Sequence, residues 1–93
     1  MIRSFGDKET EKIFNLIFSR RIPREIQERS YHKLVAIHEA ESLENLRNPS
    51  GNRLEPLRRA LEGSHSIRIN NQWRIVFRWE GTDAHDVKIT DYH

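Results

Sequence analysis

The spacing of apolar residues changes part-way along this chain, and that change constrains the fold more than any other feature of the sequence. In the first half, apolar residues recur at the intervals of an amphipathic helix. Farther on, residues 66–70 and 73–79 alternate apolar and polar side chains, as half-buried β-strands do. Helices followed by antiparallel strands are typical of an α+β domain.

Two helices are expected before the spacing changes. Asp7 can cap the first helix, which we expect to run to about Phe18 with a single buried stripe. The stripe would contain Ile13, Phe14, Ile17 and Phe18. Pro23 suits the first turn of a second helix at residues 24–41, with inward-facing Ile26, Leu34 and Ile37. We expect these helices to form an N-terminal α-hairpin, and residues 1–4 to form an edge strand.

The alternating segments predict a small antiparallel sheet packed against the α-hairpin. Residues 70–72 fit a hairpin connection, and a second turn precedes a last strand at 86–90. Residues 42–47 predict one further helical turn before a run of turn formers at 48–51. With 93 residues, of which 35% are hydrophobic, the chain has room for one domain, spanning 1–93, around a thin core.

Arginines are concentrated in the second half of the chain. Seven of them, opposed by only Glu55 and Glu62, lie in one window: Arg47, Arg53, Arg58, Arg59, Arg68, Arg74 and Arg78. Such a distribution suggests a basic surface for a polyanion, because guanidinium groups bind phosphate bidentately. In ordinary strand register, Arg68, Arg74 and Arg78 would share one face of the sheet. The alternative is that they form only the solvated side of an antiparallel sheet.

The composition excludes several kinds of site. Cysteine is absent, which excludes thiolate catalysis and cysteine-based zinc sites and suits a reducing cytoplasm. The five histidines lack a metal-ligand spacing, so we expect no metal and no cofactor. Because no segment is apolar enough for a signal peptide or a membrane span, we expect a soluble cytoplasmic protein without a membrane partner.

The last three residues, Asp91, Tyr92 and His93, place acid–base groups directly after the last expected strand. Histidine both accepts and donates a proton near neutrality. Together with arginines, these groups match metal-free RNA cleavage, in which the 2′-hydroxyl attacks its adjacent phosphate. His93 would be the general base or the general acid. Tyr92 could also be the general acid, but it would give up its proton less readily than His93. The alternative is a solvated polar tail.

Five stretches together carry a family resemblance, at residues 2–5, 43–47, 51–57, 66–75 and 91–93. In this order and spacing they resemble HigB-type toxins of the RelE/ParE superfamily. The resemblance implies a RelE-like, microbial-RNase-like fold and a toxin that cleaves messenger RNA during translation on the ribosome. It also implies a HigA-type helix-turn-helix antitoxin, which neutralises the toxin and represses their shared operon through a complex on operator DNA.

Carried over by position, the resemblance implies catalytic roles for His93 and Asp91, a supporting or stacking role for Tyr92, and phosphate stabilisation by Arg74. Arg58 stands where the family has a basic residue after the Pro-Leu pair. The RNA-binding residues that we expect beside these are Arg53, Arg59, Arg68 and Arg78. The family continues after the Pro-Leu pair with Lys-Gly-Asp and a further basic residue, whereas this chain has uncharged Leu61, a departure that would change rate or substrate preference or abolish activity.

Two other functions stay open on the sequence. A ParE-like inhibitor would bind a protein target such as DNA gyrase, and arrested cells would then show DNA damage in place of broken transcripts. A non-catalytic nucleic-acid-binding module would depend on salt and on Arg68, Arg74 and Arg78, but not on His93.

Overall fold

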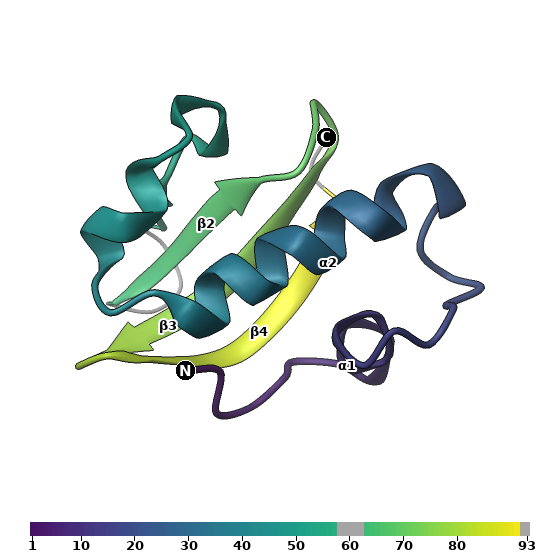
Figure 1. Ribbon diagram of the computed structural model, residues 1–93, viewed down its shortest axis with the longest axis horizontal. Coiled ribbons are helices and arrows are strands. Elements are labelled where there is room, and N and C mark those ends of the chain that lie inside the picture. Colours follow the sequence, from purple (N-terminus) through teal and green to yellow (C-terminus); the bar gives the residue numbers. More distant parts are fainter. Residues whose placement is uncertain (58–62, 92–93) are drawn as a thin grey trace.

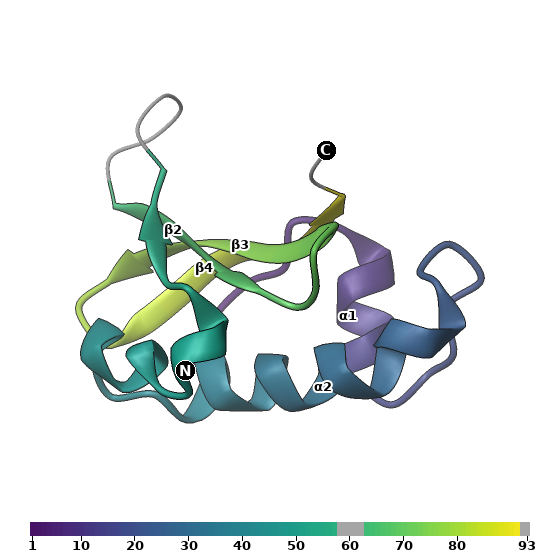
Figure 2. The same cartoon turned by 90° about the horizontal axis from the view of Figure 1, so that it is seen from above.

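Four antiparallel strands form one sheet, and α2 runs along one of its faces (Figures 1 and 2). This computed structural model describes residues 1–57 and 63–91. The helices are α1 (Lys8–Phe14), α2 (Arg24–Glu39) and the 3₁₀ turns η1 (Leu43–Arg47) and η2 (Ser50–Asn52). The strands are β1 (Glu55–Pro56), β2 (Ser64–Arg68), β3 (Trp73–Glu80) and β4 (Asp83–Asp91), in that order across the sheet. Because α1 contacts both α2 and β4, the predicted α-hairpin packed on an antiparallel sheet is confirmed.

The start of α1 follows the sequence prediction, but its end does not. Asp7 Oδ1 accepts a 2.8 Å hydrogen bond from the Thr10 amide, which caps the helix as expected. The helix stops at Phe14 because the chain reverses at Leu16, whose φ of 62° is incompatible with a right-handed helix. The predicted buried stripe is therefore wrong at Ile17 and Phe18, whose exposed fractions are 55% and 59%.

The second helix agrees closely with its prediction. It begins at Arg24 directly after Pro23 and ends at Glu39, slightly before the expected end. Its inward-facing residues, Ile26, Leu34 and Ile37, are buried as expected. No helix in the described part of the chain is long and apolar enough to cross a lipid bilayer.

The N-terminal segment meets the sheet without forming the expected edge strand. Ile2 and Phe5 make isolated parallel bridges to Ala84 and Val87 of β4. The Ile2 amide also donates to His38 Nδ1 on α2, at 3.1 Å. These contacts join the start of the chain to both layers, but a regular ladder does not develop between the bridges.

The strand register separates the sheet into an apolar face and an arginine face. Arg68 of β2 pairs with Arg74 of β3, and Arg74 pairs with Thr90 of β4. The apolar face is buried beneath α2 and contributes the following core residues: Ile67, Ile75, Phe77, Val87 and Ile89. We use "arginine face" for the opposite face, which carries Arg68, Arg74 and Arg78 as predicted. The sequence did not predict β1, and both β2 and β4 begin earlier than expected.

Candidate functional site

Arg74 is held firmly on the arginine face, with only 8% of its surface exposed. Its Nε donates to Ser66 Oγ at 2.8 Å, and its Nη2 donates to the carbonyl of Arg53 at 2.7 Å and to that of Ser66 at 3.3 Å. Glu55 Oε2 lies 3.9 Å from Nη2 and supplies a partial counter-charge. A nearly buried guanidinium needs such partners, because an unpaired buried charge is strongly unfavourable. The result is a cation with a fixed position and plane.

Arg53 connects the η2–β1 segment to this cation. Its backbone is left-handed, with φ 45° and ψ 58°, a conformation that costs energy in a residue other than glycine. This conformation turns the Arg53 carbonyl onto Arg74 while the Arg53 side chain stays exposed. The structure therefore brings two of the expected site residues, Arg53 and Arg74, into direct contact.

The other two arginines of the face have different surroundings. Arg78 Nη1 lies 2.7 Å from Glu80 Oε2, and its Nε lies 3.7 Å from Asp86 Oδ2, so carboxylates oppose its charge. Arg68 instead donates from Nε to the Asn70 carbonyl at 3.1 Å and from Nη2 to Asn71 Oδ1. Within residues 1–57 and 63–91, Arg68 has no carboxylate at ion-pair distance. The shared face thus does not make the three arginines equivalent.

Asp91 ends β4 on the face opposite Arg74. It pairs with Trp73, and residues that pair directly across antiparallel strands project to the same side. Its Oδ2 accepts a 3.2 Å hydrogen bond from Gln72 Nε2. The register therefore places Thr90, and not Asp91, beside Arg74 on the arginine face. The other expected site residues, Arg58, Arg59, Tyr92 and His93, lie outside the described residues.

The sequence reasoning missed Ser66, Glu55 and two cations on α2. Ser66 is fully buried and lies between Ser64 and Arg68 on the arginine face, so strand alternation was the signal for it. Arg29 and Lys33 are spaced four residues apart, which places them on one side of α2. They line a cleft with Arg68, although α2 and β2 are distant in sequence. In the part of the chain that the structure describes, no three His, Asp or Glu side chains are grouped to hold a metal ion.

Comparison with known proteins connects this arrangement to a toxin family. Residues 3–93 match the family described as the RelE-like toxin of type II toxin-antitoxin system HigB. Toxin HigB-1 of Vibrio cholerae is 38% identical over 80 residues, which cover 85% of this chain and 84% of that protein. Endoribonuclease HigB of Proteus vulgaris is 32% identical over 93 residues, 100% of both chains. An uncharacterized protein of Haemophilus influenzae is 30% identical over 67 residues, covering 72% of this chain and 66% of that one.

Proposed function

This chain belongs to the RelE-like HigB toxins of type II toxin-antitoxin systems, and from that membership we propose an endoribonuclease that cleaves messenger RNA while it is being translated. The end-to-end likeness to a protein named Endoribonuclease HigB supports the reaction. The structural observation that carries the proposal is the anchored guanidinium of Arg74. Cleavage of transcripts on the ribosome would stop translation and growth.

The proposed reaction is an in-line attack of the RNA 2′-hydroxyl on its own 3′-phosphate. A base removes the 2′-hydroxyl proton, the new oxygen–phosphorus bond forms, and the bond to the departing 5′-oxygen breaks. An acid gives that oxygen a proton, which leaves a 2′,3′-cyclic phosphate and a 5′-hydroxyl. We assign one of these proton transfers to His93, because imidazole has the suitable pKa, with Asp91 and Tyr92 in supporting roles.

Arg74 would stabilise the charge that develops on the phosphoryl oxygens. Such stabilisation is strongest when the donor is already oriented and shielded from water, because no reorganisation is then needed during the reaction. The hydrogen bonds to Ser66 and to the Arg53 carbonyl supply that orientation. Arg74 cannot be the acid, since a guanidinium stays protonated throughout the working pH range. In this proposal Arg58 is a further catalytic residue, and the RNA-binding residues that would add phosphate contacts are Arg53, Arg59, Arg68 and Arg78.

A type II toxin has a cognate antitoxin, and we propose that the antitoxin here is a HigA-type helix-turn-helix protein. In this proposal the antitoxin neutralises the toxin, and operator DNA is bound only through the complex of the two. The ribosome and its messenger RNA are the other partners, and action on them would place the toxin in the cytoplasm.

Transcript mapping after brief induction of the chain tests this function against gyrase inhibition. The nuclease proposal predicts new 5′-hydroxyl ends inside translated regions and no cleavage of the same RNA without ribosomes. Arg74→Ala, as the matched variant, would give far fewer ends. Intact transcripts together with double-strand DNA breaks would contradict the proposal and favour the gyrase-directed alternative.

A further inference from the structure

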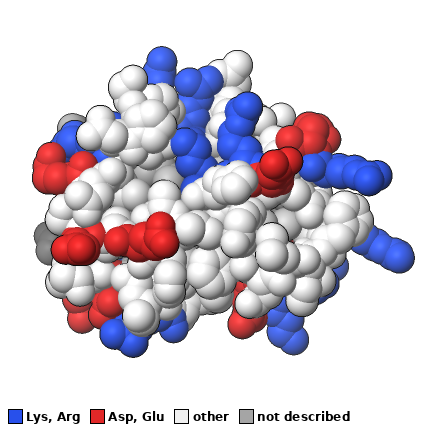
Figure 3. Space-filling model, viewed as in Figure 1, with Lys and Arg blue, Asp and Glu red and all other residues white. Residues whose placement is uncertain are grey.

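A cationic cleft lies between α2 and the β2–β3 hairpin, separate from the hydrogen bonds that hold Arg74. It has a volume of about 480 Å³, and Arg29, Lys33 and Arg68 line it together with the side of the hairpin turn at Asn70 and Asn71. Figure 3 shows Lys and Arg side chains gathered in the hollow above α2 on this side of the molecule. Three cations from two elements therefore converge on one space.

Neutral groups hold these cations in place. Arg29 Nη1 donates to the Ile69 carbonyl at 3.2 Å, Lys33 Nζ donates to Asn52 Oδ1, and Arg68 Nε donates to the Asn70 carbonyl at 3.1 Å. Carbonyl and amide oxygens orient a cation without cancelling its charge. The three cations have no carboxylate partner at ion-pair distance among residues 1–57 and 63–91. The cleft thus combines fixed donors with uncompensated positive charge.

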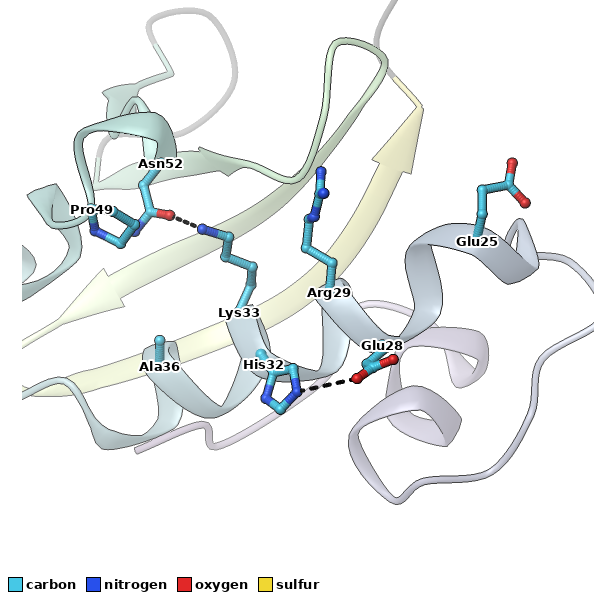
Figure 4. Close-up of a pocket in the computed structure, with 8 residues that line it drawn as sticks. All are labelled: Glu25, Glu28, Arg29, His32, Lys33, Ala36, Pro49 and Asn52. Atoms are coloured by element: carbon cyan, nitrogen blue, oxygen red, sulfur yellow. Dashed lines mark hydrogen bonds and ion pairs between the residues drawn. The ribbon is translucent and has the colours of Figure 1, made fainter.

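Two acidic side chains, Glu25 and Glu28, line the neighbouring hollow but not the cleft itself. Figure 4 shows Arg29 and Lys33 projecting from α2 towards the strands and Asn52, where they also border a second hollow of about 560 Å³. Glu28 instead lies beside His32, with 4.0 Å between Oε1 and Nε2. Burial lowers the pKa of Lys33, and the positive charge of Arg29 lowers it further. A bound anion would oppose this shift, because its negative charge favours the charged form of Lys33.

We propose that this cleft binds the phosphodiester backbone of single-stranded RNA, an inference that rests on the proposed nuclease function. Guanidinium groups suit phosphate because their donors match two oxygens at once. Arg68 links the cleft to the candidate site, because it pairs directly with Arg74 across β2 and β3. One RNA strand that runs from the cleft across Arg68 to Arg74 would contact Arg74 at the cleaved bond. The same strand would contact the cleft on one side of that bond.

The chemistry of the lining favours RNA over a protein partner. Protein–protein interfaces have an apolar centre depleted of charged residues. This cleft has three cations and two asparagines on its walls, with Ile69 as an apolar member. RNA presents a regular series of phosphates, and its affinity comes largely from such contacts.

Binding of a short RNA with methylated 2′-hydroxyls tests the inference, because such an RNA binds but cannot be cut. Its dissociation constant is measured by fluorescence anisotropy over a range of salt concentrations for the full chain and for Arg29→Gln, Lys33→Gln and Arg68→Gln. Each substitution removes one charge, so the slope of log affinity against log salt is expected to fall by about 0.7 per lost phosphate contact. Arg20→Gln, an exposed cation outside the cleft, is the matched control and keeps the slope.

Three results would overturn the inference. The first is an unchanged slope in the variants, with unfolding midpoints like that of the parent chain. The second is that inorganic phosphate displaces the labelled RNA as effectively, at equal phosphate concentration, as unlabelled RNA does. That result would indicate a site for small phosphates. The third is loss of antitoxin binding with unchanged RNA binding, which would indicate a protein-docking surface. Because the probe reports binding alone, a chain that binds it through the cleft but cuts no transcript would refute only the nuclease proposal.

Discussion

The Nε of Arg74 on β3 donates a 2.8 Å hydrogen bond to Ser66 Oγ on the neighbouring strand β2. Ser66 is fully buried, and Arg74 has only 8% of its surface exposed. A hydroxyl in this position sets the plane of the guanidinium before any RNA arrives. Ser66 is therefore a positioning residue whose effect on the reaction passes through Arg74.

Ser66→Ala removes that acceptor and should impair both stability and cleavage. A buried charged donor that loses its partner costs roughly 1–3 kcal/mol of unfolding free energy, because its desolvation is no longer offset. Transcript cleavage should slow mainly through kcat, since a misaligned Arg74 stabilises the transition state less than before. Denaturant titration and cleavage kinetics measure the two effects.

The matched variant for this test is Ser66→Thr, which keeps a hydroxyl on the same strand position. It should restore most of the cleavage rate if the hydrogen bond is what matters. Equal cleavage by Ser66→Ala and the parent chain would show that Arg74 does not depend on this contact.

Burial within the helical layer gives a second prediction, about stability alone. Leu34 is completely buried under the sheet, so Leu34→Ala should lower the unfolding free energy by about 2–5 kcal/mol. Phe18 has 59% of its surface exposed, so Phe18→Ala should change it by no more than about 0.5 kcal/mol. Urea unfolding measures both changes. If the two variants lose comparable unfolding free energy, then α1 continues to Phe18 and buries it.

Lys33 gives a prediction that depends on pH. Burial and the charge of Arg29 lower its pKa below the ordinary value of 10.5 in the folded chain. The unfolded chain then binds more protons between the two pKa values, so the unfolding free energy should rise as pH increases through the folded pKa towards 10.5. The charged groups that border the same hollows are Glu25, Glu28, Arg29, His32 and Arg68.

NMR titration of the Lys33 side chain measures this shift directly. Arg29→Gln should raise the pKa of Lys33 by removing the like charge, and the methylated RNA should raise it further by supplying phosphate. If the pKa of Lys33 equals the ordinary value of 10.5 in the parent chain, in Arg29→Gln and with the RNA bound, the electrostatic description of the cleft is wrong.

The sequence predicted those parts of the fold that depend on local chemistry. The Asp7 cap, the start of α2 after Pro23 and the alternation along β3 follow from capping, proline geometry and strand period. The end of α1 did not follow, because a leucine and not a glycine adopts the left-handed conformation at residue 16. Strand β1 contains only two residues, too few to show a period.

The candidate site was predictable only in part, because its contacts join segments that are distant in sequence. Alternation placed Arg68, Arg74 and Arg78 on one face, but only the register identifies Ser66 and Thr90 as neighbours of Arg74. The cleft depends on how α2 crosses the sheet, which no local pattern specifies. The roles of His93, Tyr92 and Arg58 remain predictions from the family resemblance.

The cleavage rate of translated messenger RNA, compared between the full chain and His93→Ala, tests the nuclease mechanism most directly. The mechanism predicts a rate lower by roughly 10²–10⁴-fold, the usual contribution of a general acid or base, at an unchanged unfolding midpoint. A chain that lacks residue 93 should behave like the substituted one. Cleavage by either variant as fast as by the full chain would contradict the mechanism.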